Sequence, residues 1–95
     1  MFIVSLTYTD FDGVDALLGA HREFLREQYG RGVFLMSGRK VPRTGGIILA
    51  AAESREEIEA ILELDPFKEA GVSQYEIIEF VPTMTSDALA SFCED

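Results

Sequence analysis

The stretch that decides the fold covers residues 32–52 and reads GVFLMSGRKVPRTGGIILAAA. It contains two apolar runs, residues 33–37 and 47–52, separated by a loop that holds Pro42 and the Gly45-Gly46 pair. Apolar runs of this length, bounded by glycine and proline, are typical of β-strands. The sequence therefore predicts two consecutive strands in the middle of the chain.

A helical pattern lies on either side of these two strands. Over residues 14–29 the apolar side chains fall on one face and the charged ones on the other, and Gly30 provides a stop signal. On the other side, residues 54–57 (SREE) form a capping box that opens a second helix. Pro66 ends that helix, because a proline disfavours helical geometry in the residue before it.

The outermost segments, residues 2–8 and 75–81, again have the composition of strands. The predicted order is strand, helix, strand, strand, helix, strand, and right-handed crossovers place both helices on one face of the sheet. We therefore expect an α+β fold, a ferredoxin-like βαββαβ domain over residues 1–83 with a four-stranded antiparallel sheet. Residues 84–95 form a C-terminal tail with a short helix around residues 88–92.

The predicted strands are apolar on both faces, as the neighbours Ile3 and Val4, or Ile47 and Ile48, illustrate. Two helices can cover only one face, and soluble monomers avoid leaving a large apolar patch exposed. A second copy of the chain would cover the other face, so we predict a homodimer. In the alternative, the tail folds over that face, but its 12 residues are too few to cover four strands.

Composition narrows the classes of partner. The 95-residue chain has a formal net charge of −9, which argues against binding to nucleic acid or to an anionic membrane surface. No apolar run is long enough to span a bilayer, and the first residues read as a strand and not as a targeting leader. Cys93 is the single cysteine, so no disulfide can form within the chain. We expect a cytoplasmic protein.

His21 is the only histidine in the sequence, and it lies in the middle of the apolar face of the first predicted helix. The ring should therefore point towards the sheet. It is either a core histidine satisfied by a backbone carbonyl or a catalytic or ligand-binding group. Gln28 lies on the same face two turns later and is either a polar wall of a pocket or a boundary residue.

Asp65 continues the apolar face of the second predicted helix, seven residues after Ile58. A carboxylate at a helix C-terminus opposes the helix dipole, so it does not stabilise that helix. Asp65 followed by Pro66 is also a good start for a further turn, and one carboxylate can do both. Because both helices pack on one face, we expect Asp65 to meet His21, to fix the ring tautomer and to raise its basicity.

The loop after the second strand holds further polar candidates. Ser37 is either a donor to a substrate oxygen or a simple strand-end serine. Arg39, Lys40 and Arg43 are three of the eight basic residues within five positions, and they form either an anion-binding rim or a solvated hairpin tip. No metal-ligand spacing and no phosphate-binding loop is present, so no metal or cofactor is predicted.

Several segments, taken in order, resemble a known family. They are residues 1–6 (MFIVSL), His21, residues 32–38 (GVFLMSG), residues 42–48 (PRTGGII), residues 65–67 (DPF), Gly71 and residues 75–80 (YEIIEF). Their order and spacing resemble the YCII-related domain family over about residues 1–83. The resemblance implies a dimeric α+β barrel.

The resemblance also implies an active site with a His/Asp pair and a nearby serine, which correspond to His21, Asp65 and Ser37. One member of the family eliminates chloride from a chlorohydroxyquinol. The candidate substrate-binding residues around these three are Gly38, Arg39, Arg43 and Phe67. Arg39 stands where the family commonly has proline after Ser-Gly, so the entrance of the pocket is expected to differ.

The leading hypothesis is a cofactor-independent lyase, isomerase or dehydrochlorinase-like enzyme that acts on a small cyclic oxygenated substrate. His21 would be the general base or acid, Asp65 would orient it, and Ser37 would donate a hydrogen bond to the substrate. Two alternatives remain open. One is a non-catalytic module or sensor that binds a small molecule in the same cavity, and the other is a cofactor-free monooxygenase-like barrel.

Overall fold

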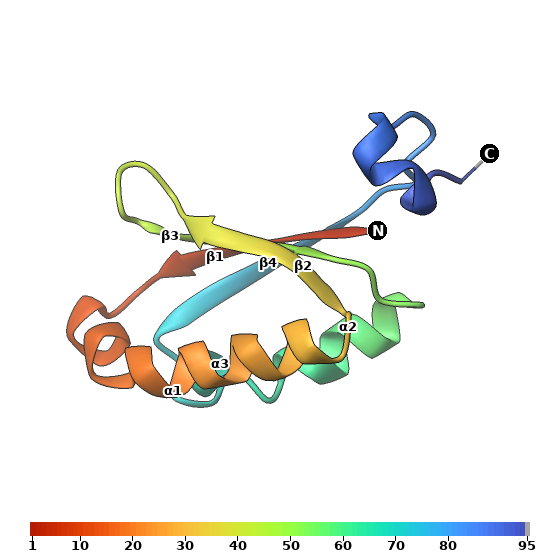
Figure 1. Ribbon diagram of the computed structural model, residues 1–95. Coiled ribbons are helices and arrows are strands. Elements are labelled where there is room, and N and C mark those ends of the chain that lie inside the picture. Colours follow the sequence, from red (N-terminus) through yellow and green to blue (C-terminus); the bar gives the residue numbers. More distant parts are fainter. Residues whose placement is uncertain (95) are drawn as a thin grey trace.

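The computed structural model describes residues 1–94 and shows two βα-type halves (Figure 1). The elements in order are β1 (Phe2–Tyr8), α1 (Phe11–Gly30), β2 (Phe34–Arg39), β3 (Gly45–Ala50), α2 (Arg55–Leu62), α3 (Pro66–Glu69), β4 (Ser73–Glu79) and the 3₁₀ helix η1 (Asp87–Phe92). The sheet order is β2-β3-β1-β4 and every pairing is antiparallel. The helices α1, α2 and α3 lie on one side of it. The predicted α+β, ferredoxin-like βαββαβ fold is confirmed.

Some element boundaries differ from the expectation, and local hydrogen bonds explain the shifts. Helix α1 begins three residues early, at Phe11, because the Asp10 side chain accepts a hydrogen bond from the Gly13 backbone N–H at 3.0 Å. Strand β4 runs two residues earlier than predicted, because Ser73 already pairs with Tyr8 of β1. The sequence pattern located the strands, but strand pairing sets their ends.

Strand β2 contains a β-bulge that changes which side chains face the helices. Phe34 pairs with Ala50 and Met36 pairs with Leu49, so Leu35 is an extra residue on β2. Beyond the bulge Ser37 pairs with Ile48, whose side chain is buried on the helix-covered face. The bulge therefore turns both Phe34 and Ser37 towards that face, although they are three residues apart.

The core lies between the helices and the sheet. Its members are Phe2, Val4, Leu6, Val14, Phe24, Val33, Phe34, Ile48, Ala50, Ile58, Ile61, Leu62, Phe67 and Val72. On the opposite face Met36, Ile47 and Ile78 remain 56%, 39% and 46% exposed. The structure thus leaves the second face of the sheet open, as the two-faced strand pattern predicted.

The C-terminal tail does not cover that open face. It folds on itself, with the Glu94 N–H donating to the Pro82 carbonyl at 2.7 Å. It projects from one end of the sheet on the side opposite the helices (Figure 1). No helix of residues 1–94 has both the length and the apolar content needed to cross a membrane.

Candidate active site

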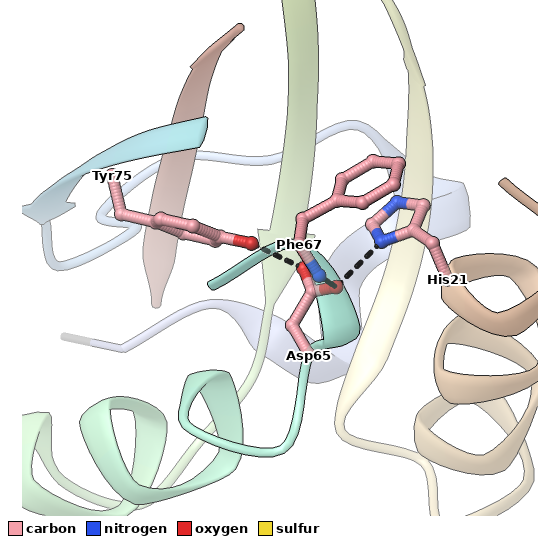
Figure 2. A network of polar contacts seen from close by, with 4 residues as sticks. All are labelled: His21, Asp65, Phe67 and Tyr75. Carbon is pink, nitrogen blue, oxygen red and sulfur yellow. Dashed lines mark hydrogen bonds and ion pairs between the residues drawn. The ribbon is translucent and has the colours of Figure 1, made fainter. Parts of the chain in front are cut away.

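His21 reaches the sheet side of α1 and pairs with a carboxylate from the other half of the chain. His21 is 9% exposed to solvent. Its Nδ1 lies 2.8 Å from Oδ1 of Asp65 (Figure 2). A carboxylate oxygen only accepts, so Nδ1 carries the proton and donates it. The imidazole of His21 is therefore hydrogen-bonded to an acidic side chain. A core histidine satisfied by a backbone carbonyl, the first of the two interpretations of the sequence, is not what the structure shows.

Asp65 is completely buried and accepts three hydrogen bonds. Oδ1 accepts from His21 Nδ1 and from the Phe67 backbone N–H at 3.0 Å, and Oδ2 accepts from the Tyr75 hydroxyl (Figure 2). The bond to Phe67 makes Asp65 the N-cap of α3, which begins at Pro66. One carboxylate thus caps a helix and holds the imidazole, as its position in the sequence allowed.

Phe67 lies behind the imidazole and not in front of it. The two rings are parallel within 7° with centroids 3.9 Å apart, and Phe67 has no exposed surface. It is absent from the cavity lining described below. The contact of Phe67 with substrate stays a prediction, and the stacking itself fixes the plane of the imidazole.

Tyr75 completes the network, and its role was missed in the sequence, where it belongs only to a predicted strand and to the segment 75–80. It pairs with Leu6, so its side chain shares the helix-covered face of β4. Partial burial and the neighbouring Asp65 carboxylate both raise the pKa of the Tyr75 phenol above its usual value. The phenol therefore stays protonated and serves as a hydrogen-bond donor.

A cavity of about 280 Å³ opens between α1 and the β2 end of the sheet, and His21 lies in its wall. Its polar side chains come from His21, Ser37, Tyr8, Arg22, Arg39 and Arg43, and the remaining lining residues are Leu6, Leu18, Leu25, Gly38, Gly46, Ile47 and Ile48. The predicted His21, Ser37, Gly38, Arg39 and Arg43 thus meet in one cavity. Asp65 stays behind the imidazole.

The second nitrogen of the imidazole is available to a ligand. Nε2 points away from Asp65 (Figure 2), and no residue among 1–94 forms a hydrogen bond with it. Within the same range, the enclosed side-chain atoms without a partner are Gln28 Nε2 and Ser73 Oγ. His21 Nε2 is not one of them, so this atom is not fully enclosed, and His21 is a lining residue of the cavity. A neutral ring with Nδ1 protonated offers a lone pair there.

Ser37 is held by a residue that sequence reasoning missed. The hydroxyl groups of Ser37 and Tyr29 are hydrogen-bonded to each other. Tyr29 belongs to the last turn of α1, and Ser37 faces that helix because of the bulge in β2. Tyr29 was predicted only as an apolar helix residue, and nothing in its spacing indicated a polar contact.

The three basic residues around the loop between β2 and β3 do not share one environment: Arg39 and Arg43 line the cavity and Lys40 does not. Arg43 forms an ion pair with Asp15 at 2.7 Å and lies 5.4 Å from the centre of the Tyr8 ring. The hydrogen bond to Asp15 raises the pKa of Arg43. Lys40 donates to the Thr7 hydroxyl at 3.3 Å and does not line the cavity. Arg39 does line it. Of the three residues of the predicted rim, Lys40 thus lies outside the cavity, Arg43 lines it but is paired with Asp15, and Arg39 lines it.

Side-chain groupings that bind metal ions in proteins consist of His, Cys, Asp and Glu residues. Residues 1–94 contain no group of three or more His, Cys, Asp or Glu side chains placed to hold a metal ion. Cys93 lies in the tail, where its Sγ contacts the Thr83 carbonyl at 3.5 Å.

Comparisons with known proteins concern the family and the fold of the chain. The sequence profile of the YCII-related domain matches residues 1–81. A search of curated proteins finds no match. Among solved structures, the chain is similar to 5-chloro-2-hydroxyhydroquinone dehydrochlorinase (TftG) from Burkholderia phenoliruptrix AC1100 in complex with 2,5-dihydroxybenzoquinone. The TM-score is 0.71 at 18% identity, covering 86% of this chain and 95% of that one, and at this identity the likeness shows the fold.

Proposed function

This chain belongs to the YCII-related domain family, and we propose that it is an enzyme that moves a proton on a small oxygenated ring compound with its His21–Asp65 pair. The observation that carries the proposal is the 2.8 Å contact between His21 Nδ1 and Asp65 Oδ1. Nε2 forms no hydrogen bond within residues 1–94, and His21 lines the cavity. The proposal needs neither metal nor cofactor, because the pair itself supplies the base.

The buried carboxylate supports a role as orienter of the base. It holds the ring in one tautomer and stabilises the imidazolium that forms when Nε2 takes a proton. Phe67 stacked on the ring prevents it from turning. A positioned general base of this kind contributes about 10²–10⁴-fold in rate.

The similar structure is named as a dehydrochlorinase, and loss of HCl is one reaction that such a pair can perform. In this reaction His21 Nε2 takes a proton from the substrate. The electron pair of the broken bond to hydrogen forms a new π bond, and chloride leaves with the electrons of the carbon–chlorine bond. Ser37 in the same cavity wall supports the proposal, since its hydroxyl can donate to a ring oxygen of the substrate.

The open sheet face supports a homodimer as the working assembly. Met36, Ile47 and Ile78 keep substantial exposed surface on a face that no helix of residues 1–94 covers (Figure 1). A second copy packed on this face would remove that apolar surface from water. We expect Ile78→Glu, a change on this face at a residue that does not line the cavity, to shift the mass in solution from dimer to monomer. A monomeric wild-type chain at micromolar concentration would contradict the dimer.

The test of the enzymatic role is turnover of chlorinated hydroquinones, followed by chloride release with an ion-selective electrode. Wild-type protein is compared with His21→Ala, with Asp65→Asn and with Asp12→Asn, which makes the same carboxylate-to-amide change at an exposed site on α1. The first two variants should lose activity by about 10²–10⁴-fold, and the third should keep it. Full activity in His21→Ala would contradict the proposal.

A second measurement, chemical modification of His21, distinguishes the proposed enzyme from the two alternative functions. Because His21 is the only histidine, the reaction of histidine with diethylpyrocarbonate reports on this site alone. A compound that protects His21 yet is recovered unchanged after long incubation would indicate a binding module or sensor. Turnover that consumes dioxygen would indicate a cofactor-free monooxygenase.

A further inference from the structure

We infer that the cavity selects small organic anions, carboxylates or phenolates, whose charge is held by Arg22 and Arg39. The inference rests on the proposed function, since it names the substrate class of the same cavity. It also revises the predicted cationic rim, because it adds Arg22 from α1 and leaves out Arg43 and Lys40.

The first argument is which basic side chains are already engaged. The chain has eight basic and 17 acidic residues. Six of the eight contact a side-chain partner: Arg26 with Glu23, Arg31 with Gln28, Lys40 with Thr7, Arg43 with Asp15, Arg55 with Glu59 and Lys68 with Glu63. Within residues 1–94 the other two, Arg22 and Arg39, form neither an ion pair nor a side-chain hydrogen bond. Both line the cavity of His21.

The second argument is that no acidic side chain of residues 1–94 lines the cavity and competes with an anionic ligand for the arginines. Asp15 is engaged by Arg43, and Asp65 is buried behind the imidazole. In a protein with a net charge of −9, a concave wall with two guanidinium groups that have no ion-pair partner within residues 1–94 is complementary to an anion. A guanidinium also offers a planar pair of donors that matches a carboxylate.

The third argument is position relative to the proposed chemistry. Arg22 follows His21 directly on α1, and both line the cavity. Arg39 follows Ser37 by two residues on β2, so the two side chains leave the strand on the same face. The anion-binding groups thus flank the proposed base and the proposed donor. An acidic substituent bound by the arginines would hold the rest of the ligand in the cavity that His21 and Ser37 also line.

The experiment compares matched acids and neutral esters. The probes are 2,5-dihydroxybenzoate, 4-hydroxybenzoate and benzoate, each with its methyl ester. Dissociation constants are measured by calorimetry, and amide resonances of His21, Gly38 and Gly46 locate the bound probe. The variants are Arg22→Gln, Arg39→Gln and the double variant. Arg26→Gln is the control, because it removes the same charge one turn further along α1.

We expect the acids to bind at least roughly tenfold more tightly than their esters, and each single variant to weaken acid binding roughly three- to tenfold. The double variant should bind acid and ester equally, and Arg26→Gln should leave both unchanged. Salt should weaken binding of the acids and not of the esters. Equal affinities in wild-type protein, or no acid bound at the three reporter amides, would overturn the inference. Ester binding at His21 under those conditions would leave the proposed enzymatic role intact.

Discussion

The Tyr75 hydroxyl donates a hydrogen bond to Oδ2 of Asp65, the carboxylate oxygen that His21 does not use. Donors from α1, α3 and β4 therefore meet on one buried carboxylate (Figure 2). A carboxylate held from both oxygens cannot rotate, so the imidazole it orients is held as well. Tyr75 does not line the cavity and is a positioning residue.

Removal of the Tyr75 hydroxyl should change the pH dependence of stability. The pKa of the phenol is raised in the folded protein, while it is about 10 in the unfolded chain. Below that pH both states hold the proton and the stabilisation is complete. Above it the unfolded chain releases a proton that the folded one keeps, so stability falls with a slope of up to about 1.4 kcal/mol per pH unit. Tyr75→Phe should lack this contribution.

Urea unfolding of wild-type protein and Tyr75→Phe at pH 8–11 measures the difference. At pH 8 the variant should be less stable by about 1.5–3 kcal/mol, the usual value of a hydrogen bond to a charged group. The two free energies of unfolding should converge as the pH rises past about 10. A constant difference across the range would show that Tyr75 does not keep its proton.

The contact between Tyr29 and Ser37 should influence ligand binding and not folding. Ser37 is exposed in the cavity wall, and its hydroxyl is held by Tyr29. Ser37→Ala should weaken binding of a hydroxybenzoate roughly 2- to 10-fold, which corresponds to one neutral hydrogen bond. Tyr29→Phe should weaken it less, because the serine hydroxyl remains but is free to rotate. Unchanged calorimetric affinity in Ser37→Ala would contradict a role in binding.

Phe67 should matter more for stability than any other aromatic residue of the site. It is fully buried and stacks on His21. Phe67→Ala should lower the free energy of unfolding by about 3–5 kcal/mol through the cavity it leaves. Phe11→Ala is the control, because Phe11 is 47% exposed, and it should cost about 1 kcal/mol or less. Similar losses of thermal stability in both variants would contradict this account.

Two glycine substitutions should have opposite effects. A Cβ on Gly45 would lie 1.8 Å from the backbone oxygen of Leu6, where β3 and β1 pair, whereas a Cβ on Gly19 meets nothing within 4 Å. Gly45→Ala should destabilise the protein by at least about 2 kcal/mol through overpacking. Gly19→Ala on α1 should stabilise it by about 0.5–1 kcal/mol. Chemical denaturation checks both, and a tolerated Gly45→Ala would refute the close approach.

Local sequence patterns predicted the element order of the fold and part of the candidate site. The alternation of apolar runs and helical periods predicted the element order, and the central position of His21 on an apolar face predicted that its ring points inward. Asp65 was expected both to cap a turn and to meet His21, and it does both. The stacking of Phe67 on the imidazole could not be predicted, since only the turn of α3 determines the direction of its side chain.

What the sequence determined by itself is the βαββαβ order, the two-faced sheet and the inward imidazole, because periodicity and capping are local properties. The tertiary structure alone decided that Tyr75 holds Asp65, that Tyr29 holds Ser37, and that Ser37 faces the helices at all. The physical reason is the bulge at Leu35: one extra residue reverses the side-chain alternation of β2, and strand pairing, not sequence pattern, determines where that residue lies.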